Sequence, residues 1–140
     1  MLNTNLDNFA SLVRSWRLAE LGVMPDDSFY FCRYIGSEHF ELRSEKIDPL
    51  KLYAVVTQGE LIKPNYIKEP CYSISCLLKV LPNKTLFFKE NNTYTVQLHL
   101  NGNVISITNE RYADALADAV IKLIQSKVLS VQSVNYKIAS

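Results

Sequence analysis

The clearest hydrophobic pattern surrounds the Asn-Gly dipeptide at 101–102, where two alternating runs, TYTVQLHL and NVISITN, lie on either side. Asn-Gly between alternating runs is typical of a two-residue type I′ hairpin. Both runs agree on one register, which a one-residue slip would destroy. The apolar side is predicted to pair Leu98 with Ile105 and Val96 with Ile107; the polar side pairs His99 with Val104, Gln97 with Ser106 and Thr95 with Thr108.

Two segments repeat their apolar residues with the period of a helix. The first covers about residues 5–21, with Thr4 as its N-cap, and it ends before Gly22, which suits the left-handed position past a helix. Its predicted apolar stripe is Leu6, Phe9, Ala10, Val13 and Trp16, with Arg14, Ser15 and Arg17 outside it. We expect Trp16, the only tryptophan, to anchor the core.

The second helical segment covers about residues 110–127, with Asn109 as the predicted N-cap. Its predicted buried stripe is Ala113, Leu116, Ala117, Val120, Leu123 and Ile124. Small residues in this stripe allow a close approach to a sheet. Outside the stripe, Asp118 and Lys122 have the spacing of a favourable ion pair.

The other apolar runs predict strands. Residues 28–35 alternate with apolar side chains on both faces, and 39–44 is the expected returning strand of a hairpin. The runs at 71–81 and 85–90 predict a buried strand and its neighbour. Along 129–138 the apolar positions change phase near residue 132, so a strand there requires a bulge or bend, or it leaves one surface and enters another.

Residues 50–57 fit a strand or a short helix, with β-branched residues favouring the strand. The following 58–70 stretch, which contains Gly59, Pro64 and Pro70, is the longest segment predicted to be irregular. Together these elements predict one α+β domain over 1–140. It has a mainly antiparallel sheet, an N-terminal helix and a second helix near the C-terminus.

The chain has a net charge of only +1, so it does not produce the strong positive field that non-specific nucleic-acid binding requires. No apolar stretch approaches the roughly 20 residues of a membrane helix, and the N-terminus lacks the pattern of a secretory signal. We therefore expect a cytoplasmic protein that binds neither nucleic acid nor membrane. Three cysteines, Cys32, Cys71 and Cys76, are interpreted as buried apolar residues, without a disulfide framework, a metal site or a cofactor.

The sequence contains no phosphate-binding glycine loop, no nucleophile elbow and no zinc-protease motif. A carboxylate or histidine site remains the less favoured enzymatic alternative, with His99 and His39 as its only histidines. For a small-molecule or nucleotide ligand, the candidate binding residues are Arg33 and Tyr34 on the first strand and Tyr66 in the 58–70 stretch.

The order of a Trp-containing helix, antiparallel strands and an Ala-rich helix resembles phage-encoded alpha-beta-alpha sandwich domains. Trp16 and the helix at 113–124 carry this resemblance. It implies a phage or mobile-element origin and no particular activity. The strands predicted at 50–57, 71–90 and 129–138 depart from that shorter pattern.

These observations favour a small non-enzymatic binding protein that holds a protein partner or associates with itself. Its aromatic residues support this hypothesis, because aromatics are enriched at interface hot spots. A small-molecule or nucleotide-binding domain is the alternative.

Overall fold

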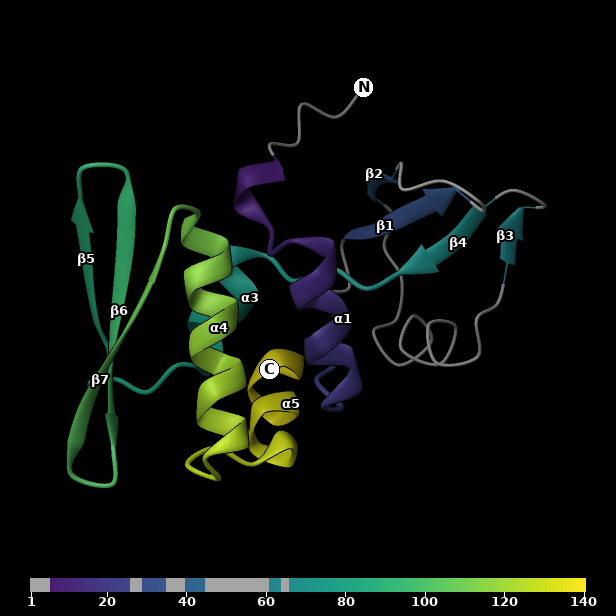
Figure 1. The fold of residues 1–140 in the computed structure, drawn as a ribbon. Coiled ribbons are helices and arrows are strands. Elements are labelled where there is room, and N and C mark those ends of the chain that lie inside the picture. The colour runs from purple at the N-terminus through teal and green to yellow at the C-terminus, as the bar shows by residue number, and fades with distance from the viewer. Residues whose placement is uncertain (1–5, 26–28, 35–39, 45–60, 64–65) are drawn as a thin grey trace.

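The computed structural model describes residues 6–25, 29–34, 40–44, 61–63 and 66–140. Within them, four α-helices lie between two antiparallel sheets (Figure 1). The predicted α+β class, with a helix near each end of the chain, is confirmed.

The first sheet has the strand order β2-β1-β4-β3. Its strands are β1 (Phe29–Tyr34), β2 (Phe40–Ser44), β3 (Leu61–Lys63) and β4 (Tyr66–Glu69). The predicted pair of strands at 28–35 and 39–44 is confirmed, and both faces of β1 are buried, at Phe31 and Cys32. The prediction that 58–70 is irregular is wrong, because β3 and β4 lie within it. The segment predicted at 50–57 lies outside the described residues.

The second sheet has the strand order β5-β6-β7, formed by β5 (Leu86–Glu90), β6 (Thr93–Leu100) and β7 (Asn103–Asn109). The predicted strand at 85–90 and every predicted cross-strand pair of the Asn-Gly hairpin are confirmed. Asn101 and Gly102 have φ values of 50° and 84°, and a type I′ turn requires positive φ at both. His99 is exposed on the polar face, as predicted.

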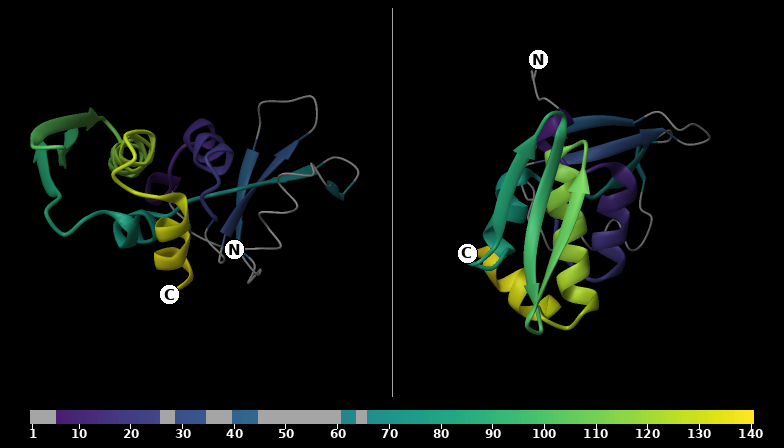
Figure 2. Two further views of the ribbon diagram at one scale, coloured as in Figure 1. Left: turned by 90° about the horizontal axis from the view of Figure 1, so that it is seen from below. Right: turned by 60° about the vertical axis from the view of Figure 1, so that its left-hand side comes forward.

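Helix α4 (Tyr112–Gln125) lies at the centre of the molecule, between the second sheet and the other helices (Figure 2). Nine of its fourteen residues are buried, among them the whole predicted stripe except half-buried Ile124. The predicted N-cap is off by two residues: Arg111 occupies that position, and its N–H donates to Asn109 Oδ1. Asp118 pairs with Arg14 of another helix, at 2.9 Å, rather than with Lys122 as predicted.

The predicted helix over 5–21 is wrong in its first half. A short 3₁₀ turn, η1 (Leu6–Asn8), comes first, and helix α1 (Leu12–Glu20) begins only after Ser11 caps it by accepting from the Arg14 N–H. Between them Phe9 forms a β-bridge with Ser73. This break moves the buried face of α1, so Val13 is 68% exposed and Ser15 is buried. The predicted end is confirmed, since Gly22 has φ 96°.

Two predicted strands are helices, and in both cases a serine begins the helix. Ser73 accepts from the Cys76 N–H at the start of α3 (Ile74–Val80), and Ser130 accepts from the Ser133 N–H at the start of α5 (Val131–Ala139). The predicted strands at 71–81 and 129–138 are therefore wrong. The phase change near residue 132 reflects helical spacing of the apolar residues, not a bulge.

The buried side chains form two clusters. The larger joins α3, α4, α5 and the inner face of the second sheet, where Val96, Leu98 and Leu100 are buried. The smaller joins Phe9, Leu12, Phe31 and Cys71 beneath the first sheet, with Trp16 packed against it. The three cysteines are buried thiols, as predicted.

Replacing Gly102 with Val is expected to lower the free energy of unfolding by roughly 1–3 kcal/mol. No atom lies within 4 Å of an added Cβ, so the cost comes from positive φ alone. Thermal unfolding measures this cost. Gly102→Asn is the control, because Asn tolerates this conformation better. Equal midpoints for Gly102→Val and the native chain would contradict the type I′ turn.

Candidate functional site

The second sheet is covered on one face only. Its inner face packs on α4 through Val96 and Leu98, and in Figure 1 no described element lies on the opposite side. Side chains alternate along a strand, so the residues between the inner ones form the outer sheet face. This outer sheet face consists of Leu86, Phe88, Glu90, Thr93, Thr95, Gln97, His99, Val104, Ser106 and Thr108.

Strand β5 has every one of its five residues exposed. Leu86 and Phe88 on the outer sheet face are each 49% exposed, and Phe87 on the inner face is 42% exposed. Phe87 lies beside the Tyr112 ring in an edge-to-face arrangement, with ring centroids 6.4 Å apart. The most apolar strand of this sheet is therefore its least covered one.

Within the described part of the chain, one backbone edge of β5 is open, since the strand is the last in its sheet. A two-residue turn at 91–92 joins it to β6, and the residues next to such a turn exchange backbone hydrogen bonds. Counting back from Glu90, every second residue directs its backbone N–H and C=O groups toward β6. These residues are Glu90, Phe88 and Leu86. The residues between, Phe87 and Lys89, direct their N–H and C=O groups to the open edge.

The opposite edge of this sheet, β7, is more polar. Its residues on the outer sheet face are Val104, Ser106 and Thr108, of which only Val104 is a large apolar side chain. Its inner residues Ile105 and Ile107 pack against the core beside α4. An apolar partner therefore gains more contact at β5 than at β7.

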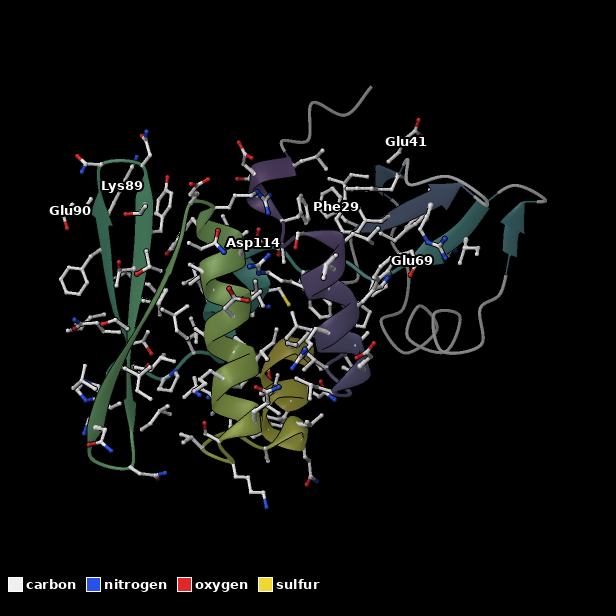
Figure 3. All side chains as sticks on the ribbon, viewed as in Figure 1. Phe29, Glu41, Glu69, Lys89, Glu90 and Asp114 are labelled. Atoms are coloured by element: carbon white, nitrogen blue, oxygen red, sulfur yellow. The ribbon has the colours of Figure 1, made fainter. Side chains whose placement is uncertain are left out.

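The first of the predicted ligand-binding residues, Arg33, is held inside the fold. Its Nε lies 2.7 Å from Glu69 Oε1, and its Cζ lies 5.7 Å from the centroid of the Trp16 ring. Glu69 is 6% exposed and also accepts from Trp16 Nε1, at 2.6 Å. Figure 3 shows Glu69 between α1 and the first sheet. Arg33 thus neutralises a buried carboxylate that connects α1, β1 and β4.

The two predicted tyrosines are neighbours by register. Tyr34 of β1 lies opposite Tyr66 of β4, next to the pair of Arg33 with Ile67. Successive positions of a strand belong to opposite faces, so the register places the tyrosines on one face and Arg33 on the other. The register therefore brings the three residues into one region of the first sheet.

Arg111 borders two hollows, of about 340 and 400 Å³, beside η1 and the start of α4. Its guanidinium is already used: it lies 2.8 Å from Asp114 Oδ2 and donates to the carbonyls of Leu6 and Phe9. Asp114 is buried and accepts from the Ser11 N–H at 2.7 Å. These groups join η1, α1 and α4, and they leave little charge for a ligand.

Two groups near this junction have shifted pKa values. Burial raises the pKa of the Tyr112 phenol, which stacks on Tyr94 with centroids 5.3 Å apart. The hydrogen bond to Asp118 raises the pKa of the Arg14 guanidinium. Both shifts favour the protonated form, so neither group is prepared to act as a base at neutral pH.

Sequence reasoning identified β5 as a strand but did not single out its exposed surface. The run Leu86-Phe87-Phe88 has the composition of a buried strand. The available signal was the turn on each side combined with the charged Lys89 and Glu90, which are typical of a strand at a sheet edge.

The comparisons with known proteins add no relative. The chain matches no protein-family model, no curated protein and no solved structure. Among the described residues, no three Cys, His, Asp or Glu side chains gather as metal ligands would. No helix in that part of the chain has the length and apolar character needed to cross a membrane.

Replacing Glu69 with Gln is expected to lower the free energy of unfolding by roughly 1–3 kcal/mol. Trp16 and Arg33 both donate to Glu69, whereas Gln offers one acceptor and one donor. Because Trp16 is the only tryptophan, its fluorescence also reports the change. Glu20→Gln, at an exposed position on α1, is the control. An unaltered spectrum and unaltered stability in Glu69→Gln would contradict this network.

Proposed function

We propose that this chain is a non-enzymatic protein-binding module, and that it holds its partner along β5 and the adjoining outer sheet face. One observation carries the proposal: β5 is exposed along its whole length although it begins with Leu86-Phe87-Phe88. Soluble proteins normally protect such an edge with charge, proline or a covering segment.

The proposed mode of binding is strand addition. An extended partner segment would take up the outward N–H and C=O groups of Phe87 and Lys89, and its alternate side chains would cover Leu86 and Phe88. Backbone hydrogen bonds provide affinity in this mode, and the side chains provide specificity. Thr95 and Thr108 extend the outer sheet face beside Phe88, with their hydroxyl oxygens 3.1 Å apart.

The alternative, a small-molecule or nucleotide-binding domain, has weaker support. Arg33, a predicted ligand-binding residue, and Arg111, which borders two hollows, are each occupied by a buried carboxylate of the same chain, Glu69 and Asp114 respectively. Releasing either arginine would leave a buried charge without its partner, which is strongly unfavourable.

A photoreactive phenylalanine derivative in place of Phe88 tests this function in cells of the native host. We expect it to crosslink to a discrete protein, with the crosslinked peptide located by mass spectrometry in an extended segment. The control carries the same group in place of Val13, which is 68% exposed on α1. The proposal is wrong if position 88 yields no adduct, or only the adducts that position 13 yields.

A further inference from the structure

We propose that the segment held by β5 is the β5 strand of a second copy of this chain, so that two copies share one six-stranded antiparallel sheet. This inference rests on the proposed function, because it uses the same open edge. The two-fold axis would pass beside Phe87, perpendicular to the sheet. Such an interface is isologous, since the same residues face one another from both sides.

The backbone of β5 favours this axis. A two-fold axis perpendicular to the sheet places the inner faces of both copies on the same side of the shared sheet. Each residue of β5 must therefore lie opposite a residue of the second copy that belongs to the same sheet face. Phe87 opposite Phe87 of the second copy satisfies this condition. The N–H and C=O of Phe87 point to the open edge, so the two Phe87 residues would exchange both hydrogen bonds. Lys89 N–H would donate to the carbonyl of Thr85, whose own N–H donates to the Pro82 carbonyl.

The side chains are complementary in the same register. The segment from Lys84 to Glu90 reads KTLFFKE, with Phe87 at its centre. Antiparallel pairing about Phe87 places Lys84 of one copy opposite Glu90 of the other, and Leu86 opposite Phe88. Each pair occurs twice, once on either side of the two-fold axis. Among these positions, Leu86, Phe88 and Glu90 alternate on the outer sheet face, and Lys84 lies in the turn that leads into β5. Two apolar pairs would thus be flanked by an ion pair at each end.

The charged residues of this register are available for pairing. Lys84 and Glu90 are exposed, and Figure 3 shows Glu90 on the side of β5 away from α4. On the inner face, Lys89 would lie opposite Thr85, and its Nζ already sits 5.4 Å from the Tyr94 ring centroid. The register therefore places no pair of like charges directly opposite each other, which would be unfavourable.

Net charge and area indicate how tight the dimer would be. A net charge of +1 gives two copies little mutual repulsion. Large aromatic side chains bury about 150–250 Å², so the exposed half of Phe88 offers roughly 100 Å². With Phe87 and Leu86 the apolar contribution is about 300 Å² per copy, below the roughly 800 Å² of a standard interface. We therefore expect a dimer that dissociates on dilution through the micromolar range.

Charge reversal tests the register without disturbing the fold, because both charged positions are exposed. In Lys84→Glu the pairs become Glu with Glu, and in Glu90→Lys they become Lys with Lys. Each variant alone should dimerise at least tenfold more weakly than the native chain, because both end pairs become repulsive. The double variant Lys84→Glu/Glu90→Lys restores opposite charges and should dimerise like the native chain.

A mixture of the two single variants is the sharpest form of this test. The variant with two glutamates would pair with the variant with two lysines through two ion pairs. With one variant labelled with ¹⁵N, native mass spectrometry should show mixed dimers in excess of either pure dimer. Sedimentation equilibrium gives the dissociation constants, and circular dichroism verifies that each variant is folded.

Two results would overturn the inference. A dimer that Lys84→Glu leaves unchanged would use another surface, such as the β7 edge. A native chain that stays monomeric up to millimolar concentration would exclude a second copy as the partner. If that monomer still crosslinks another protein from position 88, the proposed function stands and only the identity of the partner is wrong.

Discussion

The burial of α4 is the constraint on which the rest of this structure depends. Nine of its fourteen residues are buried, so the helix must be covered on nearly every side. The second sheet covers one side, and α1, α3 and α5 cover the others (Figure 2). The buried Asp114 fixes the start of the helix against Ser11 and Arg111. Small residues such as Ala115 and Ala119 allow these elements to approach closely.

The same constraint leaves β5 bare. A single helix is about 10 Å wide with its side chains. The outer two backbones of a three-stranded sheet are already roughly 10 Å apart, so one helix does not cover the whole width of such a sheet. Helix α4 packs on β6 and β7, so β5 extends beyond it, and Phe87 of that strand is 42% exposed. Covering the helix completely thus produces a sheet with one uncovered face and one uncovered apolar edge.

Sequence reasoning predicted the elements whose local chemistry is decisive. The Asn-Gly hairpin, the buried stripe of α4 and the strands β1, β2 and β5 follow from alternation, period and turn residues. The predictions failed at two short apolar runs, where a serine caps a helix and the apolar pattern alone suggested a strand. Ser73 and Ser130 begin helices in segments whose apolar residues also fit strands. A run of seven to nine residues is too short for periodicity alone to decide.

The candidate site was less predictable because it depends on what is missing around a strand. Leu86 and Phe88 have a composition typical of the core, and only the position of β5 at the end of the sheet exposes them. Arg33 shows the opposite case. It was predicted to bind a ligand, but Glu69, thirty-six residues away in sequence, occupies its guanidinium. Pairing at that separation depends on tertiary structure, which a single sequence does not contain.

The most direct test asks whether the open edge of β5 binds a second copy of the chain. It measures hydrogen exchange at the backbone amides of Phe87 and Lys89 by NMR over a dilution series. If two copies pair along β5, these amides exchange slowly in concentrated protein and fast after dilution, while the amides of Leu86 and Phe88, bonded to β6, stay protected throughout. Fast exchange of Phe87 and Lys89 at every concentration would contradict this pairing.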